Sequence, residues 1–221
     1  MSKNVVITGA NRGIGLALTK QFLSRGYQVY ALCRQSSEQL SGTTAVVIEN
    51  VDVATDEGLS AMVDGLAGIN VDVLICNAGI LRDEGIGRLN NETIVEQFMV
   101  NSLAPINVVD RLSSQLITGS KIAMITSRMG SIADNGSGGR YGYRMSKAAL
   151  NAASMSLAKD LAHDDISVGI YHPGYVQTDM VNHGGDISAD VCAERLANHI
   201  ENQSMADTGV FKHSNGEILP W

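Results

Sequence analysis

The sequence predicts an α/β protein whose mostly parallel sheet carries helices on both faces. Short apolar, β-branched runs alternate with longer amphipathic runs along the whole chain. The 221 residues, 44% of them hydrophobic, suffice to bury a full core, so we expect one domain spanning residues 1–221. Glycine is frequent, at 23 residues, and proline is scarce, at three. The glycines therefore indicate tight turns or close backbone approaches rather than linkers.

The first strand is expected at residues 5–8, and the helix that follows it runs from Ile14 to about Gly26. Further apolar, β-branched runs predict strands at residues 27–33, 44–48, 71–76, 122–126, 166–171 and, closing the sheet, 209–213. Apolar residues at helical spacing predict helices at residues 57–66, 92–116, 143–162 and 189–200. The helix at 92–116 is expected to be long or broken, with Pro105 as the candidate kink. Because strands and helices alternate, consecutive strands should be parallel and the sheet doubly wound.

Charge and cysteine content limit the classes of function. Sixteen basic and 23 acidic residues give a net charge of −7, which disfavours nucleic acids and anionic membrane surfaces as partners. The first residues turn glycine-rich before a signal peptide could complete its apolar core, and no apolar run reaches the ~18 residues of a membrane span. Three cysteines without paired spacing fit a reducing compartment. We therefore expect a cytoplasmic protein with no nucleic-acid or membrane partner.

A glycine-rich turn joins the first strand to the first helix. Residues 8–15, Thr-Gly-Ala-Asn-Arg-Gly-Ile-Gly, place glycine at positions 9, 13 and 15. Backbone N–H groups at a helix N-terminus can bind a pyrophosphate only where side chains leave room. The spacing differs from G-x-G-x-x-G, and a tight turn without a ligand is the alternative. The position, at the first strand-to-helix turn of an α/β chain, favours a dinucleotide site.

A second motif lies at the start of the helix expected at residues 143–162. Tyr143 and Lys147 are four residues apart and therefore share one helical face. A nearby ammonium lowers the pKa of a phenol, which can then act as a general acid or base. Taken alone, this pair favours an ordinary helix pair without a function. In combination with the glycine turn, it favours a catalytic pair. Tyr141 has Met145 four residues on, so we assign it to packing or substrate contact.

With these motifs, the chain resembles the short-chain dehydrogenase/reductase family from Val5 to about Met180. The matching motifs occur in the family's order: Thr8-Gly9-(x)3-Gly13-Ile14-Gly15, Asp52-Val53, Asn77-Ala78-Gly79, Asn101-Ser102, Ile125-Thr126-Ser127, Tyr143-(x)3-Lys147 and Pro173-Gly174-(x)3-Thr178. The resemblance implies a single-domain Rossmann-type doubly wound parallel sheet. It also implies hydride transfer between a nicotinamide and a small-molecule carbonyl or alcohol substrate.

The last residues, 215–221, resemble the C-factor-like branch of this family, which includes small carbonyl reductases. That branch is associated with cell-to-cell signalling. A dinucleotide-binding signalling or sensor protein is therefore the second hypothesis.

The resemblance implies a catalytic tetrad of Asn101, Ser127, Tyr143 and Lys147. Tyr143 would exchange a proton with the substrate oxygen, and Ser127 would hydrogen-bond that oxygen as charge develops. Lys147 would hold the nicotinamide ribose and lower the pKa of Tyr143, while Asn101 would anchor a proton-relaying water. The implied cofactor-binding residues are Gly9, Asn11, Arg12, Gly13, Ile14, Gly15, Arg34, Asp52, Val53, Asn77, Ala78, Gly79, Tyr143, Lys147, Pro173, Gly174, Val176 and Thr178.

The end of the second strand indicates which nicotinamide cofactor is used. An NAD enzyme places a carboxylate there to bind the ribose hydroxyls, whereas this chain has Cys33 followed by Arg34. Arg34 and Arg12 suit a 2′-phosphate, although solvated surface arginines are the alternative. We therefore expect NADP(H). The five histidines lack metal-ligand spacing, so we expect no metal, and Ser127 lacks the G-x-S-x-G pattern of serine hydrolases.

The resemblance also implies a homo-oligomer, because the helices expected at residues 92–116 and 143–162 often pair subunits in this family. A homodimer is the first choice and a homotetramer the second. Tyr143 lies sixteen positions after Ser127, a longer interval than is common in the family, and the extra length lies in the loop 135–139. About seven residues, 181–187, precede the last helix, so we expect an open site for exposed or bulky carbonyl compounds, which Met129 and Met180 could line.

Overall fold

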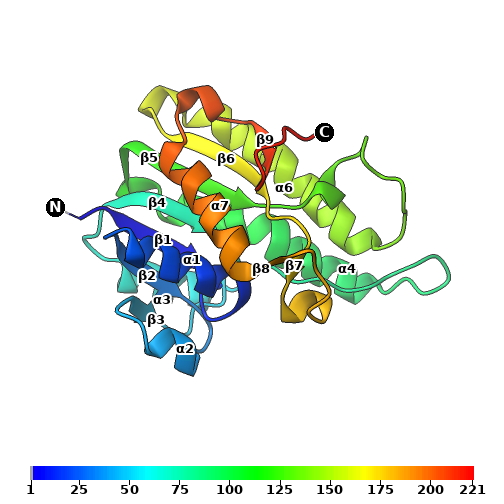
Figure 1. Cartoon of the computed structure of the whole chain (residues 1–221), viewed down its shortest axis with the longest axis horizontal. Helices are drawn as coiled ribbons and strands as arrows, with labels where there is room; N and C mark the ends of the chain where they lie inside the picture. Colours follow the sequence, from blue (N-terminus) through cyan, green and yellow to red (C-terminus); the bar gives the residue numbers. More distant parts are fainter. Residues whose placement is uncertain (1) are drawn as a thin grey trace.

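The computed structural model describes residues 2–221 and confirms the α/β architecture (Figure 1). Within this range, seven parallel strands form the main sheet in the order β3-β2-β1-β4-β5-β6-β9. The strands are β1 (Asn4–Thr8), β2 (Gln28–Leu32), β3 (Val46–Ile48), β4 (Val71–Cys76), β5 (Leu116–Ile125), β6 (Ser167–His172) and β9 (Phe211–His213). The helices are α1 (Gly13–Ser24), α2 (Glu38–Ser41), α3 (Asp56–Gly65), α4 (Asn91–Phe98), α5 (Ala104–Arg111), α6 (Tyr141–Asp160) and α7 (Ala189–Asn202).

Apolar side chains on both faces of the sheet hold the layers together. Val5 and Ile7 of β1 join a buried cluster with Phe22 of α1, on the face that α1 and α7 cover (Figure 1). Val6, between them, points to the opposite face and joins a cluster with Met62 of α3 and Leu150 of α6. The sequence of a strand that is buried on both faces is a continuous apolar run. For this reason apolar and polar residues do not alternate in β1.

The strand order reverses beside β1. Val5 of β1 pairs with Val29 of β2 on one side and with Val73 of β4 on the other, both in parallel. The connections after β1 and β4 therefore leave the sheet in opposite directions and open a crevice at the carboxyl ends of these strands. The glycine turn after β1 and residues 77–79 after β4 border this crevice.

The expected helix at residues 92–116 is broken, and its expected end is wrong. A π-helical turn, Met99–Leu103, separates α4 from α5, and Pro105 lies in the first turn of α5. Helical backbone runs into Pro105 from the π-helical turn, so the N–H that proline lacks would otherwise bond to a carbonyl oxygen of that turn, and the regular ladder is interrupted just before it. Leu116 does not end a helix but begins β5, where it pairs with Val71. Helix α5 ends at Arg111, and a 3-10 turn, Ser113–Gln115, leads from it into the strand.

Other differences from the expected elements are local. Helix α6 begins at Tyr141, two residues early, and the short helix α2 was not predicted. Two further strands, β7 (Val176–Gln177) and β8 (Ile187–Ser188), form a separate parallel pair around the short segment that precedes α7. The expected closing strand is confirmed as β9, which pairs with β6.

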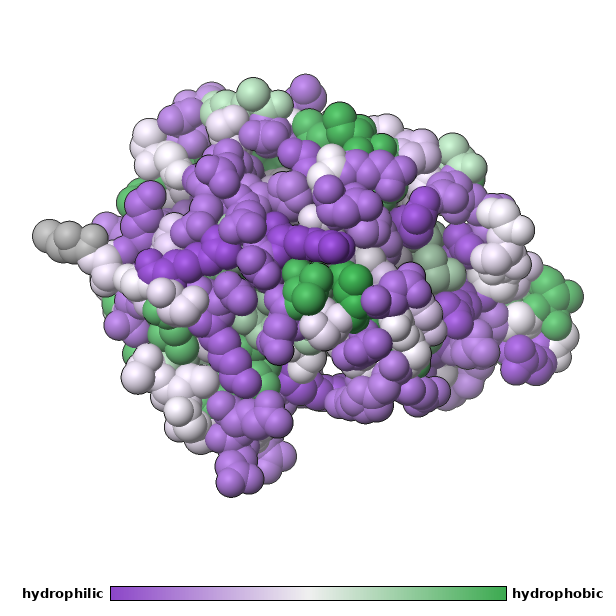
Figure 2. All heavy atoms as spheres, in the orientation of Figure 1, coloured by the Kyte–Doolittle hydropathy of each residue, from purple (hydrophilic) through white to green (hydrophobic). Residues whose placement is uncertain are grey.

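The surface of the face in Figure 2 is mainly hydrophilic, with small, separate apolar patches. In residues 2–221, no helix is long and apolar enough to cross a membrane.

Candidate active site

The glycine turn after β1 has the backbone that a dinucleotide site requires. Gly9 and Gly13 have φ of +64° and +54°, a conformation that favours glycine. A Cβ on Gly15 would overlap the carbonyl oxygen of Gly9 and lie 2.6 Å from Nδ2 of Asn77. Arg12, at the N-cap of α1, makes no side-chain cap. The N-terminus of α1 thus has uncapped N–H groups and little side-chain bulk, which suits a pyrophosphate.

Thr8, a residue that sequence reasoning did not assign to the site, joins the ends of β1 and β4. Its hydroxyl accepts hydrogen bonds from the backbone N–H groups of Asn77 (3.0 Å) and Ala78 (3.1 Å). In return, Nδ2 of Asn77 donates to the carbonyl oxygens of Thr8 (3.0 Å) and Gly9 (3.2 Å). A threonine at the last position of a buried strand was the available signal. These bonds fix the predicted Asn77-Ala78-Gly79 segment against the glycine turn.

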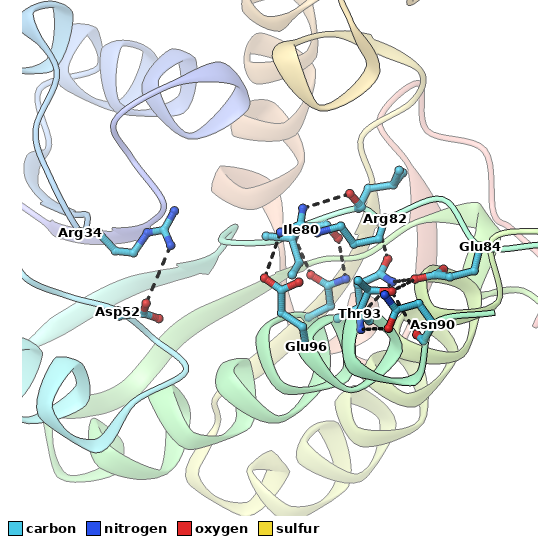
Figure 3. Close-up of polar contacts among 11 residues, drawn as sticks. Arg34, Asp52, Ile80, Arg82, Glu84, Asn90, Thr93 and Glu96 are labelled. Carbon is cyan, nitrogen blue, oxygen red and sulfur yellow. Dashed lines mark hydrogen bonds and ion pairs between the residues drawn. The ribbon is translucent and has the colours of Figure 1, made fainter. Parts of the chain in front are cut away.

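The two arginines expected to select the cofactor lie on the exposed rim, and each faces an aspartate. Nη1 of Arg12 lies 3.1 Å from Oδ2 of Asp179. Nη1 of Arg34 lies 3.9 Å from Oδ2 of Asp52, the pair drawn in Figure 3. The sequence pattern did not reveal either pairing. Nearby, Nδ2 of Asn11 donates to the carbonyl oxygen of Gln35 at 2.8 Å and so holds the loop after β2 beside the glycine turn.

Val53 and Ile14 contribute less to a ligand surface than the other predicted cofactor residues. The side chain of Val53 is buried and packs in the core cluster that contains Leu59, so only its backbone is available to a ligand. Ile14 is half-buried against the core on the other face of the sheet.

Tyr143, Ser127 and Lys147 are buried together where β5 and α6 meet. Nζ of Lys147 donates to the carbonyl oxygen of Ile125 at 2.9 Å and lies 5.9 Å from the centre of the Tyr143 ring. Burial lowers the pKa of Lys147 to about 8. Burial also raises the pKa of Tyr143, while a hydrogen bond with Ser127 and the charge of Arg140 act in the opposite direction. The phenol therefore remains protonated at neutral pH, and the pKa of Tyr143 departs in the direction opposite to the one expected from Lys147, because burial outweighs the groups that lower it.

Asn101 lies in the π-helical turn, and its side chain is fully buried. Its Oδ1 accepts from the N–H of Ile80 (2.8 Å), and its Nδ2 donates to the carbonyl oxygen of Ile80 (2.8 Å) and to Oγ of Ser146 (3.0 Å). Single π-helical turns occur often at functional sites. Here the turn places the Asn101 amide so that it bonds both to the segment after β4 and to helix α6. A Cβ on Gly79 would lie 3.2 Å from Oδ1 of Asn101, so the same segment passes directly over it.

The segment after β6 reaches back to the glycine turn. Cγ2 of Thr178 would lie 3.4 Å from a Cβ on Gly13, and Val176 is buried in the β7–β8 pair. The carbonyl oxygen of Pro173 accepts from Oγ of Ser214 at 2.7 Å, and Gly174 has φ of +100°. The Pro173-Gly174 turn is thus anchored to the residues after β9.

The structure therefore brings the four predicted catalytic side chains to the carboxyl ends of the strands, beside the glycine turn. This is where α/β proteins bind their ligands. Within residues 2–221, no group of three or more His, Cys, Asp and Glu side chains could hold a metal ion.

Comparison with known proteins shows which family the chain resembles in sequence and in structure. A family model described as short chain dehydrogenase matches residues 3–186. The chain is 34% identical over 223 residues to 1-hydroxy-2-glutathionyl-2-methyl-3-butene dehydrogenase of Rhodococcus sp. (strain AD45), covering 98% of this chain and 99% of that one. It is 36% identical over 157 residues to C-signal of Myxococcus xanthus, covering 68% of this chain and 93% of the relative. The solved structure of NADPH-bound carbonyl reductase from chicken fatty liver superimposes with a TM-score of 0.89 at 26% identity, covering 100% of this chain and 99% of that one.

Proposed function

Since this chain belongs to the short-chain dehydrogenase family, we propose that it is an NADP(H)-dependent oxidoreductase acting on a small carbonyl or alcohol substrate. The observation that carries this proposal is the buried group of Tyr143, Ser127 and Lys147 beside the glycine turn. A phenol, a hydroxyl and an ammonium gathered in this way can deliver one proton to a carbonyl oxygen.

The residues at the crevice fit NADP(H). Gly9, Gly13 and Gly15 form a cradle that a Cβ would fill, and the uncapped start of α1 offers N–H groups to a pyrophosphate. Arg12 and Arg34 are exposed cations that would bind a 2′-phosphate. The carbonyl reductase from chicken fatty liver, a structural neighbour of this chain, is described as bound to NADPH. When bound, the cofactor supplies or accepts the hydride.

In the direction of reduction, Tyr143 donates its phenolic proton to the substrate oxygen. Its raised pKa keeps that proton in place at neutral pH. Ser127 donates a hydrogen bond to the same oxygen and stabilises the charge that develops on it. Lys147, held by the carbonyl oxygen of Ile125, keeps its positive charge below about pH 8 and favours the phenolate that remains. Its other two N–H donors are suited to the ribose hydroxyls.

Asn101 supports this group through its amide, which ties the segment after β4 to α6 through Ile80 and Ser146. The water relay expected from the family resemblance stays a prediction. Because the amide already has these partners, such a relay would depend on other polar atoms of the π-helical turn.

We propose that the chain acts as one domain, in the cytoplasm, and as a homodimer, with a homotetramer as the alternative. Helices α4 and α6 support the dimer, since α4 exposes Val95 and Phe98 and α6 exposes Met145. Light scattering on the purified protein gives the subunit number directly.

A signalling role is the second candidate, favoured by the similarity to C-signal of Myxococcus xanthus. A Tyr143→Phe protein separates the two. If the biological phenotype survives when turnover is lost and NADPH binding is retained, the enzymatic account of function is wrong.

The experiment that tests the main proposal follows NADPH and NADH consumption with a panel of aldehydes, ketones and quinones. A glutathione-conjugated alcohol with NADP⁺ completes the panel, because the name of the Rhodococcus relative describes such a substrate. We expect turnover with at least one compound and a preference for NADPH of at least about tenfold, the worth of one charge-assisted bond to phosphate. A preference for NADH would overturn the roles given to Arg12 and Arg34.

A further inference from the structure

Glu84, in the loop after β4, is a buried carboxylate that the proposed chemistry does not use. Only 3% of its surface is exposed. In the part of the chain that the structure describes, no Lys, Arg or His forms an ion pair with it; Arg82 pairs with Glu96 (2.9 Å) and Arg140 with Asp83 (3.6 Å). Burying a carboxylate without a cation is costly unless hydrogen bonds stabilise its charge. The hydrogen-bond partners of Glu84 therefore indicate its role in the structure.

Those partners come from two helices. Oε1 of Glu84 accepts from Oγ1 of Thr93 and from Nε2 of Gln97, both at 2.7 Å and both on α4 (Figure 3). Oε2 accepts from the backbone N–H of Gly142, at 3.3 Å, in the first turn of α6. The backbone carbonyl oxygen of Glu84 also accepts from the N–H of Arg140 at 2.8 Å. One residue thus ties the loop after β4, helix α4 and the start of α6 together.

The start of α6 depends on this outside partner. Arg140, at its N-cap, has φ of +49° and makes no side-chain cap. The carboxylate of Glu84 instead accepts a first-turn N–H and places negative charge at the positive end of a 20-residue helix. Gly142 makes the approach feasible, since a Cβ there would overlap Nε2 of Gln97 and lie 3.0 Å from Cα of Ile94.

Tyr143 follows directly after Gly142 and is held from its other side as well. Oγ of Ser146 donates to the carbonyl oxygen of Tyr143 at 2.8 Å and accepts from Nδ2 of Asn101 at 3.0 Å. The backbone that carries the phenol therefore lies between two buried attachments, one through Ser146 and one through Glu84. We propose that Glu84 is a positioning residue, which fixes the start of α6 so that the phenol of Tyr143 reaches the substrate oxygen. This inference rests on the proposed function.

The test is the Glu84→Gln protein. The amide has the same shape, but its NH2 group cannot accept a hydrogen bond. If the amide oxygen keeps the two donors on α4, the N–H of Gly142 loses its acceptor and the start of α6 shifts. Proton transfer is sensitive to displacements well below 1 Å, so we expect kcat per NADPH-binding site to fall by about tenfold or more. The dissociation constant for NADPH should stay within about twofold, because none of the hydrogen bonds of Glu84 reaches the glycine turn.

The matched control is Ser154→Ala. Ser154 is also buried on α6, where its hydroxyl donates to the carbonyl oxygen of Leu150 at 2.6 Å, three turns from Tyr143. Its loss should lower stability and leave kcat per NADPH-binding site within about twofold of the wild type. A role of Glu84 in stability alone would lower the number of binding sites in the same way, without changing kcat per site.

A Glu84→Gln protein with the wild-type kcat per site overturns the positioning role. If that protein does not fold, Thr93→Val removes one donor to Oε1 and leaves the bond to Gly142, and it should lower kcat per site by about two- to fivefold. An unchanged kcat in Thr93→Val then overturns the proposal. A wild-type protein without reductase activity would overturn the proposed function and the positioning role with it, whereas an active wild type and an equally active Glu84→Gln overturn the positioning role alone.

Discussion

Substituting either member of the ion pair between Arg12 and Asp179 tests how the protein selects NADPH over NADH. The two side chains are 68% and 56% exposed, so their mutual attraction contributes about 1 kcal/mol or less. A guanidinium bound to a 2′-phosphate contributes more, about 1.5–3 kcal/mol, because the bond is charge-assisted and frequently bidentate. Arg12 should therefore leave the aspartate for the phosphate when NADPH binds.

Arg12→Gln removes a cation that we propose binds the 2′-phosphate. Converting about 1.5–3 kcal/mol into affinity predicts NADPH binding weaker by about 10- to 150-fold, with the affinity for NADH unchanged. Asp179→Asn removes the competing carboxylate, so it should act in the opposite direction and tighten NADPH binding by up to about fivefold. Opposite effects from the two members of one ion pair are hard to produce through general damage to the fold.

Fluorescence titration of each variant with NADPH and NADH, at low and high ionic strength, measures these changes. The advantage of NADPH should shrink as salt screens the exposed charges. An Arg12→Gln protein that binds NADPH as tightly as the wild type, or that loses both cofactors equally, would rule out a specific contact between Arg12 and the 2′-phosphate. So would an Asp179→Asn protein with weaker NADPH binding.

Two further predictions concern the glycine turn and the buried lysine. Gly15→Ala should weaken NADPH binding by at least about tenfold in the same titration, because its Cβ would overlap the carbonyl oxygen of Gly9. The control, Gly136→Ala, places its Cβ in open space and should bind NADPH as the wild type does. Equal binding by both variants would contradict a pyrophosphate site at the glycine turn. The pKa of Lys147 falls from 10.5 to about 8 on burial, so between about pH 8 and 10 the unfolded chain binds a proton that the folded chain has lost. The free energy of unfolding should therefore rise with pH over this window by about 1–2 kcal/mol more in the wild type than in Lys147→Met, and equal slopes in urea titrations would count against the low pKa.

The fold could be predicted because its strands are buried on both faces. Val5, Val6 and Ile7 form a continuous apolar run, and such runs alternating with amphipathic helices allow few arrangements. The one large error, the helix extended to Leu116, arose because Leu112 and Leu116 lie four residues apart, a spacing that fits a helical face, whereas residues 113–115 form a 3-10 turn and Leu116 begins a strand. Pairing with Val71, which settles the question, is a contact between distant parts of the chain.

The site could be predicted where its residues follow one another in fixed spacing, as in the glycine turn and the Tyr143–Lys147 pair. The site could not be predicted where function depends on contacts between residues that are far apart in the sequence. Glu84 and Gly142 are separated by 58 residues, and Arg12 and Asp179 by 167. No local pattern marks such pairs, so the cap on α6 and the carboxylates opposite the arginines emerge only from tertiary structure.

The central proposal is that Tyr143 delivers the proton to a carbonyl oxygen beside bound NADPH. Its most direct test compares kcat of wild-type and Tyr143→Phe proteins with the best carbonyl substrate, each corrected for the fraction of sites that bind NADPH. We predict a fall of about 10²- to 10⁴-fold, the range for loss of a general acid, with NADPH affinity within about threefold of wild type. A Tyr143→Phe protein that binds NADPH and turns over at a rate close to the wild type would contradict the role of Tyr143 as the proton donor.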